Sequence, residues 1–154
     1  MEKTENLYNA GFKKRTAQVY SFVRKDMVLS PNFYFDYATV LSDLKMTDLA
    51  LAELNKYKRF IYNDQTAKLI AKLYFDKKDF SRAEQYFKDA VFINPKLFRN
   101  RYDLFQFYLE TGQSDKAVYW GNSILQLEPK IPSVNVDLIK EKTTGKLRML
   151  LETK

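Results

Sequence analysis

The chain contains no cysteine and no histidine among its 154 residues. Their absence excludes thiolate nucleophiles, disulfides, imidazole bases and zinc sites built from Cys and His. The four glycines, Gly11, Gly112, Gly121 and Gly145, stand far apart, so the sequence has no glycine-rich phosphate loop. Its carboxylates, lysines and tyrosines form no recognisable catalytic group. We therefore expect a protein that is not an enzyme and that holds no metal and no cofactor.

Long apolar runs are also missing. No run approaches the roughly 20 residues that cross a bilayer, and the first residues, Met-Glu-Lys-Thr-Glu-Asn, lack the apolar stretch of a secretion signal. As given, the chain is expected to be soluble. Glycine and proline number only four each, beside 12 Phe and 11 Tyr. This composition predicts long helices joined by short turns, because large packing side chains are many and chain-bending residues are few.

The net charge of +7 permits a nucleic acid, an acidic protein or an anionic membrane surface as a partner. Lys and Arg are nevertheless interleaved with Asp and Glu, as in Lys77-Lys78-Asp79, instead of forming one block. This pattern favours an ordinary solvated surface over a basic docking face.

A repeat runs through most of the sequence. Three kinds of residue recur 34 positions apart, namely Ala83 with Ala117, Tyr74 with Tyr108, and Pro95 with Pro129. The alanine position continues upstream in steps of 33 at Ala50 and Ala17, and the tyrosine position at Leu41 and Tyr8. An interval of this length is the signature of stacked helix-turn-helix units.

The clearest copy covers residues 64–97 and matches the tetratricopeptide (TPR) pattern of small and large residues. Ala71 and Ala83 are small where the two helices of a unit press together, and Phe87 fills the same seam. Pro95 ends the second helix because proline lacks an N–H and crowds the preceding turn.

Two further units flank this copy. The unit at 31–63 has five residues in register and no closing proline: Tyr37, Ala38, Leu41, Ala50 and Leu54. The unit at 98–131 keeps Leu104, Tyr108, Ala117 and Pro129 but carries Gly121 and Ile124 in place of the second-helix Phe and Ala, which indicates a degenerate copy. A partial unit at 1–30 is expected to begin partway through a repeat, as in a piece of a longer protein.

The pattern predicts helices over 14–28, 31–44, 47–61, 64–77, 80–93, 97–111, 114–127 and 134–151. Thr47, Ser81 and Ser114 are expected to cap the second helices, with Glu84 completing a capping box begun by Ser81.

The segment 133–151 breaks the period and is predicted to be a capping helix. Five of its residues share one helical face: Val136, Ile139, Thr143, Leu147 and Leu150. A helix lying on a membrane surface is the alternative. In all, the sequence predicts one all-α domain over 1–154, a right-handed α-α superhelix of about three and a half TPR units and a capping helix.

Three segments are also similar to a more specific family. They are NFYFDYATVLSDLKMTDLALAELNKYKRF, the repeat from Ala71 to Pro95, and PKIPSVNVDLIKEK. Together they resemble the C-terminal TPR domain attached to O-antigen ligase and polymerase-like membrane proteins of Bacteroidetes, over roughly residues 8–151. The resemblance implies an extramembrane part of a bacterial inner-membrane protein of lipopolysaccharide biosynthesis, with the periplasmic side favoured over the cytoplasmic one. Any activity would then lie in a membrane portion outside this chain, and no catalytic residue is implied here.

In a TPR stack the first helices of successive units line the concave groove that binds a partner. Counting along the three units predicts eight groove residues: Phe35, Thr39, Lys68, Lys72, Phe75, Arg99, Tyr102 and Gln106. This basic and aromatic lining suits a protein or peptide segment with acidic and aromatic or apolar residues. The alternative is that some of these aromatics belong to the core between repeats.

Other functions stay open at this stage. Chaperone-binding TPR proteins grip a terminal carboxylate with a basic and Asn-rich set, and Phe35 and Thr39 stand at two of those places, which disfavours that role. Tyr and Phe faces that stack on sugar rings would make a glycan-binding module, and the net charge alone favours a nucleic-acid-associated helical repeat. A protein-interaction scaffold is the leading interpretation.

Overall fold

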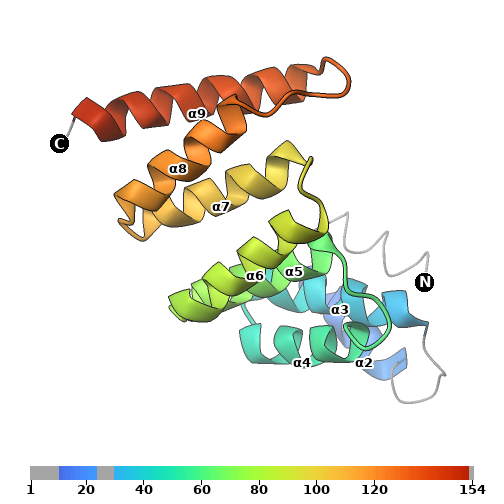
Figure 1. Cartoon of the computed structure of the whole chain (residues 1–154). Helices are drawn as coiled ribbons and strands as arrows, with labels where there is room; N and C mark the ends of the chain where they lie inside the picture. Colours follow the sequence, from blue (N-terminus) through green and yellow to red (C-terminus); the bar gives the residue numbers. More distant parts are fainter. Residues whose placement is uncertain (1–10, 24–29, 153–154) are drawn as a thin grey trace. The chain divides into compact units, whose positions relative to one another are not determined.

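The computed structural model describes residues 11–23 and 30–152, and every regular element in these two ranges is an α-helix. The helices are α2 (Lys13–Val23), α3 (Pro31–Asp43), α4 (Thr47–Tyr57), α5 (Asp64–Asp76), α6 (Phe80–Ile93), α7 (Phe98–Glu110), α8 (Ser114–Leu125) and α9 (Val134–Glu152) (Figure 1). The all-α prediction is confirmed. Tyr8 and the predicted helical residues 24–28 lie outside the described residues.

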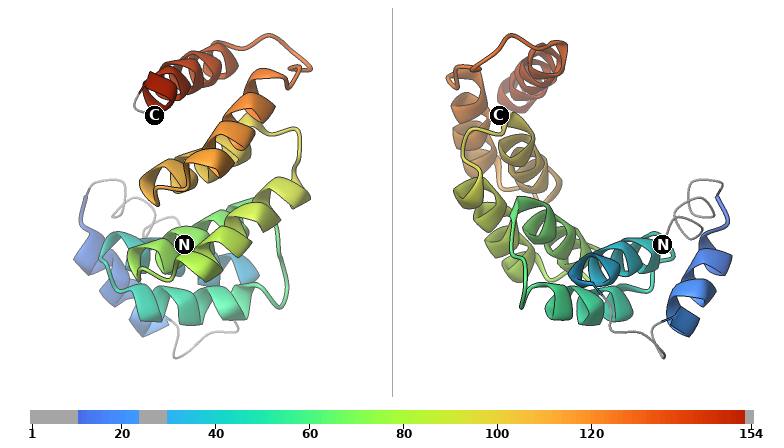
Figure 2. Two further views of the ribbon diagram at one scale, coloured as in Figure 1. Left: turned by 60° about the vertical axis from the view of Figure 1, so that its left-hand side comes forward. Right: turned by 90° about the vertical axis from the view of Figure 1, so that its right-hand side faces the viewer.

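The chain divides into an N-terminal part, residues 1–79, and a C-terminal part, residues 80–154. In the N-terminal part α3 and α4 form an antiparallel pair, and α2 packs on α3 through the rings of Tyr20 and Tyr37, which stack with centroids 5.4 Å apart. In the C-terminal part α7 and α8 form a second antiparallel pair, and α9 packs against both (Figure 2).

Most positions that the repeat predicted to be tightly packed are buried. Ala50, Ala83 and Ala117 have no exposed surface, whereas Ala17, the first alanine of the series, and Tyr74 are only half-buried. Other predicted core residues are also buried: Tyr37, Ala38, Leu41, Leu54, Ala71, Phe87, Ala90, Leu104, Tyr108 and Ile124. The 33–34-residue interval therefore marks matching packing positions, since a side chain larger than Ala there would hold neighbouring helices apart.

The turns that end α3, α5 and α7 share one hydrogen-bond pattern. The N–H of the residue before the next helix donates to a carbonyl five positions back, at 2.9 Å in each case: Met46 to Leu41, Asp79 to Tyr74, and Gln113 to Tyr108. The residues just before these donors are Lys45, Lys78 and Gly112, with φ of 60°, 62° and 70°. This is the Schellman motif, which satisfies the last carbonyls of a helix through one left-handed residue.

These turns explain why the predicted caps were wrong. Each turn finishes immediately before the next helix, so α4 and α8 begin at Thr47 and Ser114 themselves, and α6 begins one residue ahead of Ser81. The N-cap positions fall on Met46 and Gln113, neither of which makes a side-chain capping bond.

Asn63 is a helix cap that the sequence pattern did not predict. Its side-chain oxygen accepts the backbone N–H and the hydroxyl of Thr66, both at 2.9 Å, and α5 begins at Asp64. The helix before it, α4, ends at Tyr57, four residues short of the predicted end.

Glu84 joins three helices of the C-terminal part in place of a capping box. Its carboxylate accepts hydrogen bonds from Lys88 of α6 at 2.6 Å, from the Tyr108 hydroxyl of α7 at 3.0 Å and from Lys116 of α8 at 3.1 Å. Burial on its own would raise the pKa of Glu84, but these hydrogen bonds outweigh it and lower the pKa to about 2. Burial and the bond to Glu84 both raise the pKa of Tyr108, which keeps its proton and donates it.

Gly121, one of the departures from the repeat pattern in the third unit, lies against the last helix. A Cβ placed on Gly121 would lie 2.8 Å and 2.9 Å from the two Cδ atoms of Leu147 and 3.0 Å from its Cγ. Leu147 and Thr143 are buried on the predicted face of α9, and Val136, Ile139 and Leu150 on that face are half-buried. Glycine at position 121 therefore allows α9 to pack closely on α8. A phenylalanine there, as at Phe87 in the preceding unit, would push α9 away.

The left-handed turns predict opposite effects for two kinds of substitution. No atom lies within 4 Å of a Cβ added to Gly112, so Gly112→Ala costs only backbone strain, about 1 kcal/mol of unfolding free energy. Lys78→Gly relieves the same strain and should be more stable than Lys78→Ala by about 1 kcal/mol, since both lose the same side chain. Urea unfolding of the three variants measures these differences, and equal stability of the two Lys78 variants would contradict the assignment.

The close contact between Gly121 and Leu147 predicts that substitutions at the two positions have strongly coupled effects on stability. Gly121→Ala should destabilise by about 1–2 kcal/mol, because crowding outweighs the gain of about 1 kcal/mol in helix propensity. In a Leu147→Ala background the crowding is gone, and the same change should be neutral or stabilising. A double-mutant cycle by urea denaturation checks this, and an effect of Gly121→Ala that is the same in both backgrounds would refute the packing.

The Glu84 network predicts acid-sensitive stability. Because the folded pKa of Glu84 is lowered from 4.5 to about 2, its contribution is complete above pH 4.5 and disappears as the pH falls towards 2. Glu84→Gln should cost about 1 kcal/mol at pH 7, allowing for solvent screening, and almost nothing at pH 2. Unfolding free energies across this range measure the difference, with the exposed Glu141→Gln as control. A Glu84→Gln penalty that does not change with pH would count against the network.

Candidate partner-binding surfaces

The predicted groove residues of α3 are partly turned into the N-terminal part. Phe35 is half-buried, and its ring centroid lies 5.2 Å from that of Tyr57 on α4. The Thr39 hydroxyl donates to the Phe35 carbonyl at 3.0 Å. Phe35 therefore serves the packing of α3 on α4 as well as the surface, as the core alternative anticipated.

The predicted residues of α5 form a stripe along one side of that helix. Lys68, Lys72 and Phe75 are spaced by four and three residues, which brings them to one helical face. Lys72 is exposed, while Lys68 and Phe75 are half-buried. Within the residues that the structure describes, neither Lys68 nor Lys72 makes a hydrogen bond or ion pair. Two unpaired cations beside an aromatic ring thus lie on this face.

The predicted residues of α7 face α9 in the C-terminal part. Arg99 is exposed, and its Nε donates to Asp103 at 2.9 Å. Tyr102 is half-buried, and burial is the main cause of its raised pKa. The positive charge of Arg99 lowers this pKa, and the negative charge of Asp103 raises it. The hydroxyl is therefore neutral and available as a hydrogen-bond donor.

Gln106 is covered by the capping helix. Its Oε1 accepts a hydrogen bond from Lys146 of α9, while its Nε2 is buried with no partner in the described part of the chain. Gln106 was predicted to be an exposed groove residue because the repeat pattern does not show which residues a non-repeating last helix covers.

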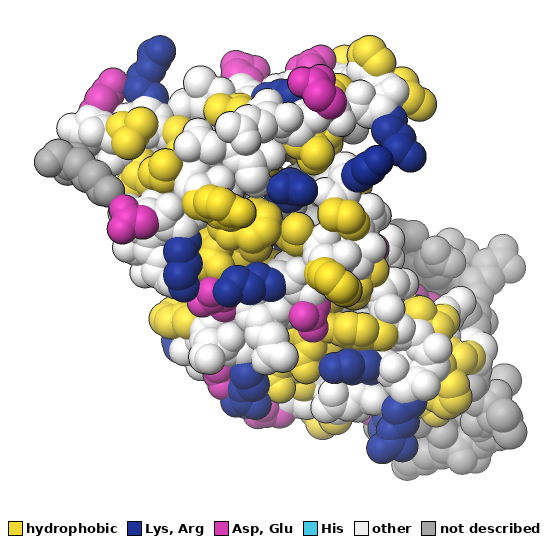
Figure 3. Space-filling view, viewed as in Figure 1, with side chains coloured by type: hydrophobic (Ala, Val, Ile, Leu, Met, Phe, Trp, Pro, Cys, Tyr) yellow, Lys and Arg dark blue, Asp and Glu magenta, His cyan; other side chains and the backbone are white. Residues whose placement is uncertain are grey.

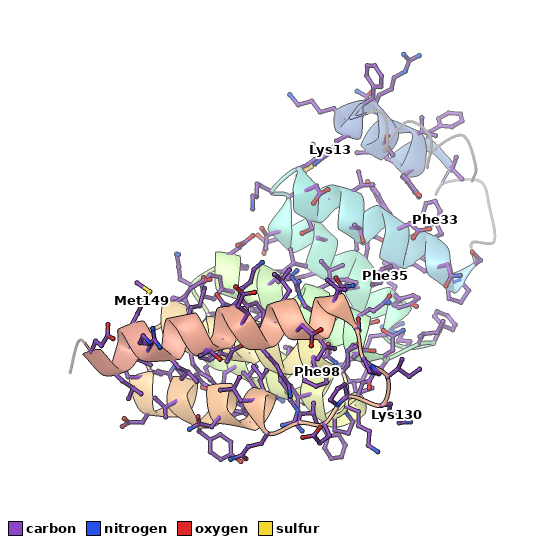
Figure 4. All side chains as sticks on the ribbon, turned by 90° about the horizontal axis from the view of Figure 1, so that it is seen from above. Lys13, Phe33, Phe35, Phe98, Lys130 and Met149 are labelled. Atoms are coloured by element: carbon purple, nitrogen blue, oxygen red, sulfur yellow. The ribbon has the colours of Figure 1, made fainter. Side chains whose placement is uncertain are left out.

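A cleft of about 660 Å³ opens between the start of α7, the α8–α9 connection and the first half of α9. Its apolar lining includes Phe98, Tyr102, Ile131, Val136 and Ile139, and its basic side chains are Lys96, Arg99, Lys130 and Lys142. Figure 4 shows Phe98 beside α9 and Lys130 on the connection that leads into it. On the face drawn in Figure 3, apolar side chains over α7 and α9 lie next to Lys and Arg.

The cleft was only partly foreseen. Arg99 and Tyr102 belong to the predicted groove, whereas the residues of α9 and of the connection do not. The available signal was the alternation of lysines and apolar residues in Pro129-Lys130-Ile131-Pro132, directly before a helix with one apolar face.

Other kinds of site find no support in the described residues. In residues 11–23 and 30–152, no three acidic side chains gather where a metal ion could be held. None of the helices in those ranges has the length and apolar character required to span a bilayer.

Comparison with known proteins identifies the fold. No protein-family model and no curated protein matches the sequence. Among solved structures, a MamA fragment from Desulfovibrio magneticus RS-1 matches with a TM-score of 0.75 and 17% identity, over 82% of this chain and 72% of the fragment. The C-terminal part of a TPR repeat-containing protein from Cytophaga hutchinsonii gives 0.73 and 16%, over 95% of this chain and 58% of its own.

A third solved structure is similar over almost the whole chain. YrrB, described as a TPR protein with an unusual peptide-binding site, matches with a TM-score of 0.66 and 15% identity, over 96% of this chain and 76% of its own. At these identities the likeness concerns the fold. The chain therefore has a TPR fold.

Proposed function

We propose that this chain is a non-catalytic scaffold that binds a segment of a partner protein on the first helices of its repeats. The proposed surface of the N-terminal part comprises Phe35, Thr39, Lys68, Lys72 and Phe75, and that of the C-terminal part comprises Arg99 and Tyr102, without the covered Gln106. The observation that carries the proposal is the stripe on α5, where Lys68 and Lys72 lack partners among the described residues and lie beside Phe75.

The chemistry of this stripe favours an acidic segment with an apolar residue. Unpaired ammonium groups on a folded surface gain charge-assisted hydrogen bonds when carboxylates reach them. An aromatic ring beside them supplies contact area at little entropic cost, since it has few rotatable bonds. YrrB supports the proposal by analogy of fold, because its structure is described as containing a peptide-binding site.

We also propose a cellular setting for the scaffold, the extramembrane side of an envelope polysaccharide assembly protein. The support is the similarity of the segments after Pro31, Ala71 and Pro129 to the TPR domain of O-antigen ligase-like proteins. A glycan-binding module remains the second candidate, favoured by exposed rings such as Phe22, Phe92 and Tyr119.

The α5 stripe predicts that charge reversal abolishes peptide binding. Screening the full chain against an array of peptides of varied charge should select acidic peptides with aromatic or aliphatic residues. Lys68→Glu/Lys72→Glu should weaken the binding of these peptides by about tenfold or more, because two attractive charge interactions become repulsive. The control Arg59→Glu/Arg148→Glu makes the same change in net charge at two exposed positions away from the predicted surface.

Two results would argue against this function. If no peptide is selected while a glycan array gives saturable binding, the glycan-binding candidate replaces the scaffold. If peptides bind but both double variants weaken this binding equally, the attraction comes from the overall charge and not from α5.

A further inference from the structure

The basic rim of the cleft between α7 and α9 lacks internal partners. Lys96, Lys130 and Lys142 are exposed, and none of them makes a hydrogen bond or ion pair with any described residue. Glu128 is the one carboxylate among the residues that line the cleft. Elsewhere in the described chain many lysines are paired, as Lys116 is with Glu84. The rim therefore concentrates positive charge that the protein itself leaves uncompensated.

The wall and rim of the cleft carry unusually exposed apolar side chains. Ile131 is 77% exposed and Leu138 is 44% exposed, and the more buried Phe98 lies deeper in the same cleft. Ile131 and Leu138 leave hydrocarbon in water that a ligand would cover, at about 25 cal/mol for each Å² removed, whereas Phe98 is only 6% exposed. Apolar surface rimmed by charge is characteristic of an interaction site.

The connection that borders the cleft also has free backbone groups. The backbone N–H groups of Lys130 and Ile131 donate no hydrogen bond within the described part of the chain. Pro129 and Pro132 flank them and favour extended backbone over helix for the residues before them. A carbonyl or carboxylate oxygen of a bound peptide could accept a hydrogen bond from one of these N–H groups.

We propose that this cleft binds an acidic segment of a partner protein, with one aromatic or large aliphatic side chain against Phe98, Ile131 and Leu138 and carboxylates on the three unpaired lysines. The inference rests on the proposed scaffold function and names a particular subsite for it. A cleft of about 660 Å³ falls in the range of roughly 300–1,000 Å³ that holds ligands of drug size, which a few peptide residues match.

A peptide fits these observations better than a nucleic acid or a lipid surface. Phosphate backbones need a basic stripe along which they can run, whereas the three lysines surround one bounded apolar cleft. The two free N–H groups of the connection can donate to carbonyl or carboxylate oxygens of a peptide that lies in the cleft.

The test is fluorescence anisotropy with the full chain and a fluorescein-labelled ten-residue acidic peptide that has one central Trp. Matched probes replace the Trp by Ala, or every carboxylate by its amide. Lys130→Glu/Lys142→Glu should weaken binding by about tenfold or more, and Ile131→Ser/Leu138→Ser should remove the preference for Trp over Ala. Arg59→Glu/Arg148→Glu, with the same net charge as the lysine variant, should bind like the unmodified chain. All four positions changed in the cleft are exposed, so these variants are expected to fold.

The α5 variant separates this inference from the proposed function. If Lys68→Glu/Lys72→Glu alone abolishes binding and the cleft variants do not, the scaffold function stands and the cleft is not the subsite. If the acidic peptide does not bind, or if phosphatidylglycerol vesicles or an oligonucleotide bind through Lys130 and Lys142 in its place, the proposed occupant is wrong.

Discussion

The contact between Gly121 and Leu147 determines where α9 lies, and the surface of the C-terminal part follows from that position. Glycine removes the side chain that would otherwise fill the seam, and Leu147 enters until its branched end would touch any added Cβ. With Leu147 seated, Lys146 reaches Gln106 and the first half of α9 forms one wall of the cleft. A packing detail of one residue pair thus decides which part of α7 is covered and which part stays open.

Charge is distributed unevenly around this framework. The Glu84 carboxylate accepts hydrogen bonds from Lys88, Lys116 and Tyr108, and in this partly buried network the two lysines stabilise the fold. The lysines of the cleft rim and of the α5 stripe have no such partners among the described residues. The net charge of +7 is therefore informative only after the paired cations have been set aside.

The repeat was readable from sequence because close helix packing demands small residues at a fixed interval, and Ala50, Ala83 and Ala117 are all fully buried. The caps were misplaced because the left-handed turns at Lys45, Lys78 and Gly112 end directly before the next helix, and at two of the three a lysine stands where sequence rules expect glycine. The role of Gly121 could not be predicted from the repeat, because its partner, Leu147, lies outside the repeat. The repeat placed Lys68, Lys72 and Phe75 on one face of α5, but which residues of α7 are covered by α9 depends on tertiary packing that periodicity does not contain.

The most direct test of the packing of α9 is the nuclear Overhauser effect between the α protons of Gly121 and the methyl groups of Leu147 in the full chain. The structure predicts strong cross-peaks, because a carbon substituent on Gly121 would fall within 3 Å of the Leu147 side chain. Absent cross-peaks, with Leu147 methyl shifts close to those of an unfolded chain, would show that α9 does not pack there, and the cleft beside α7 would lose its wall.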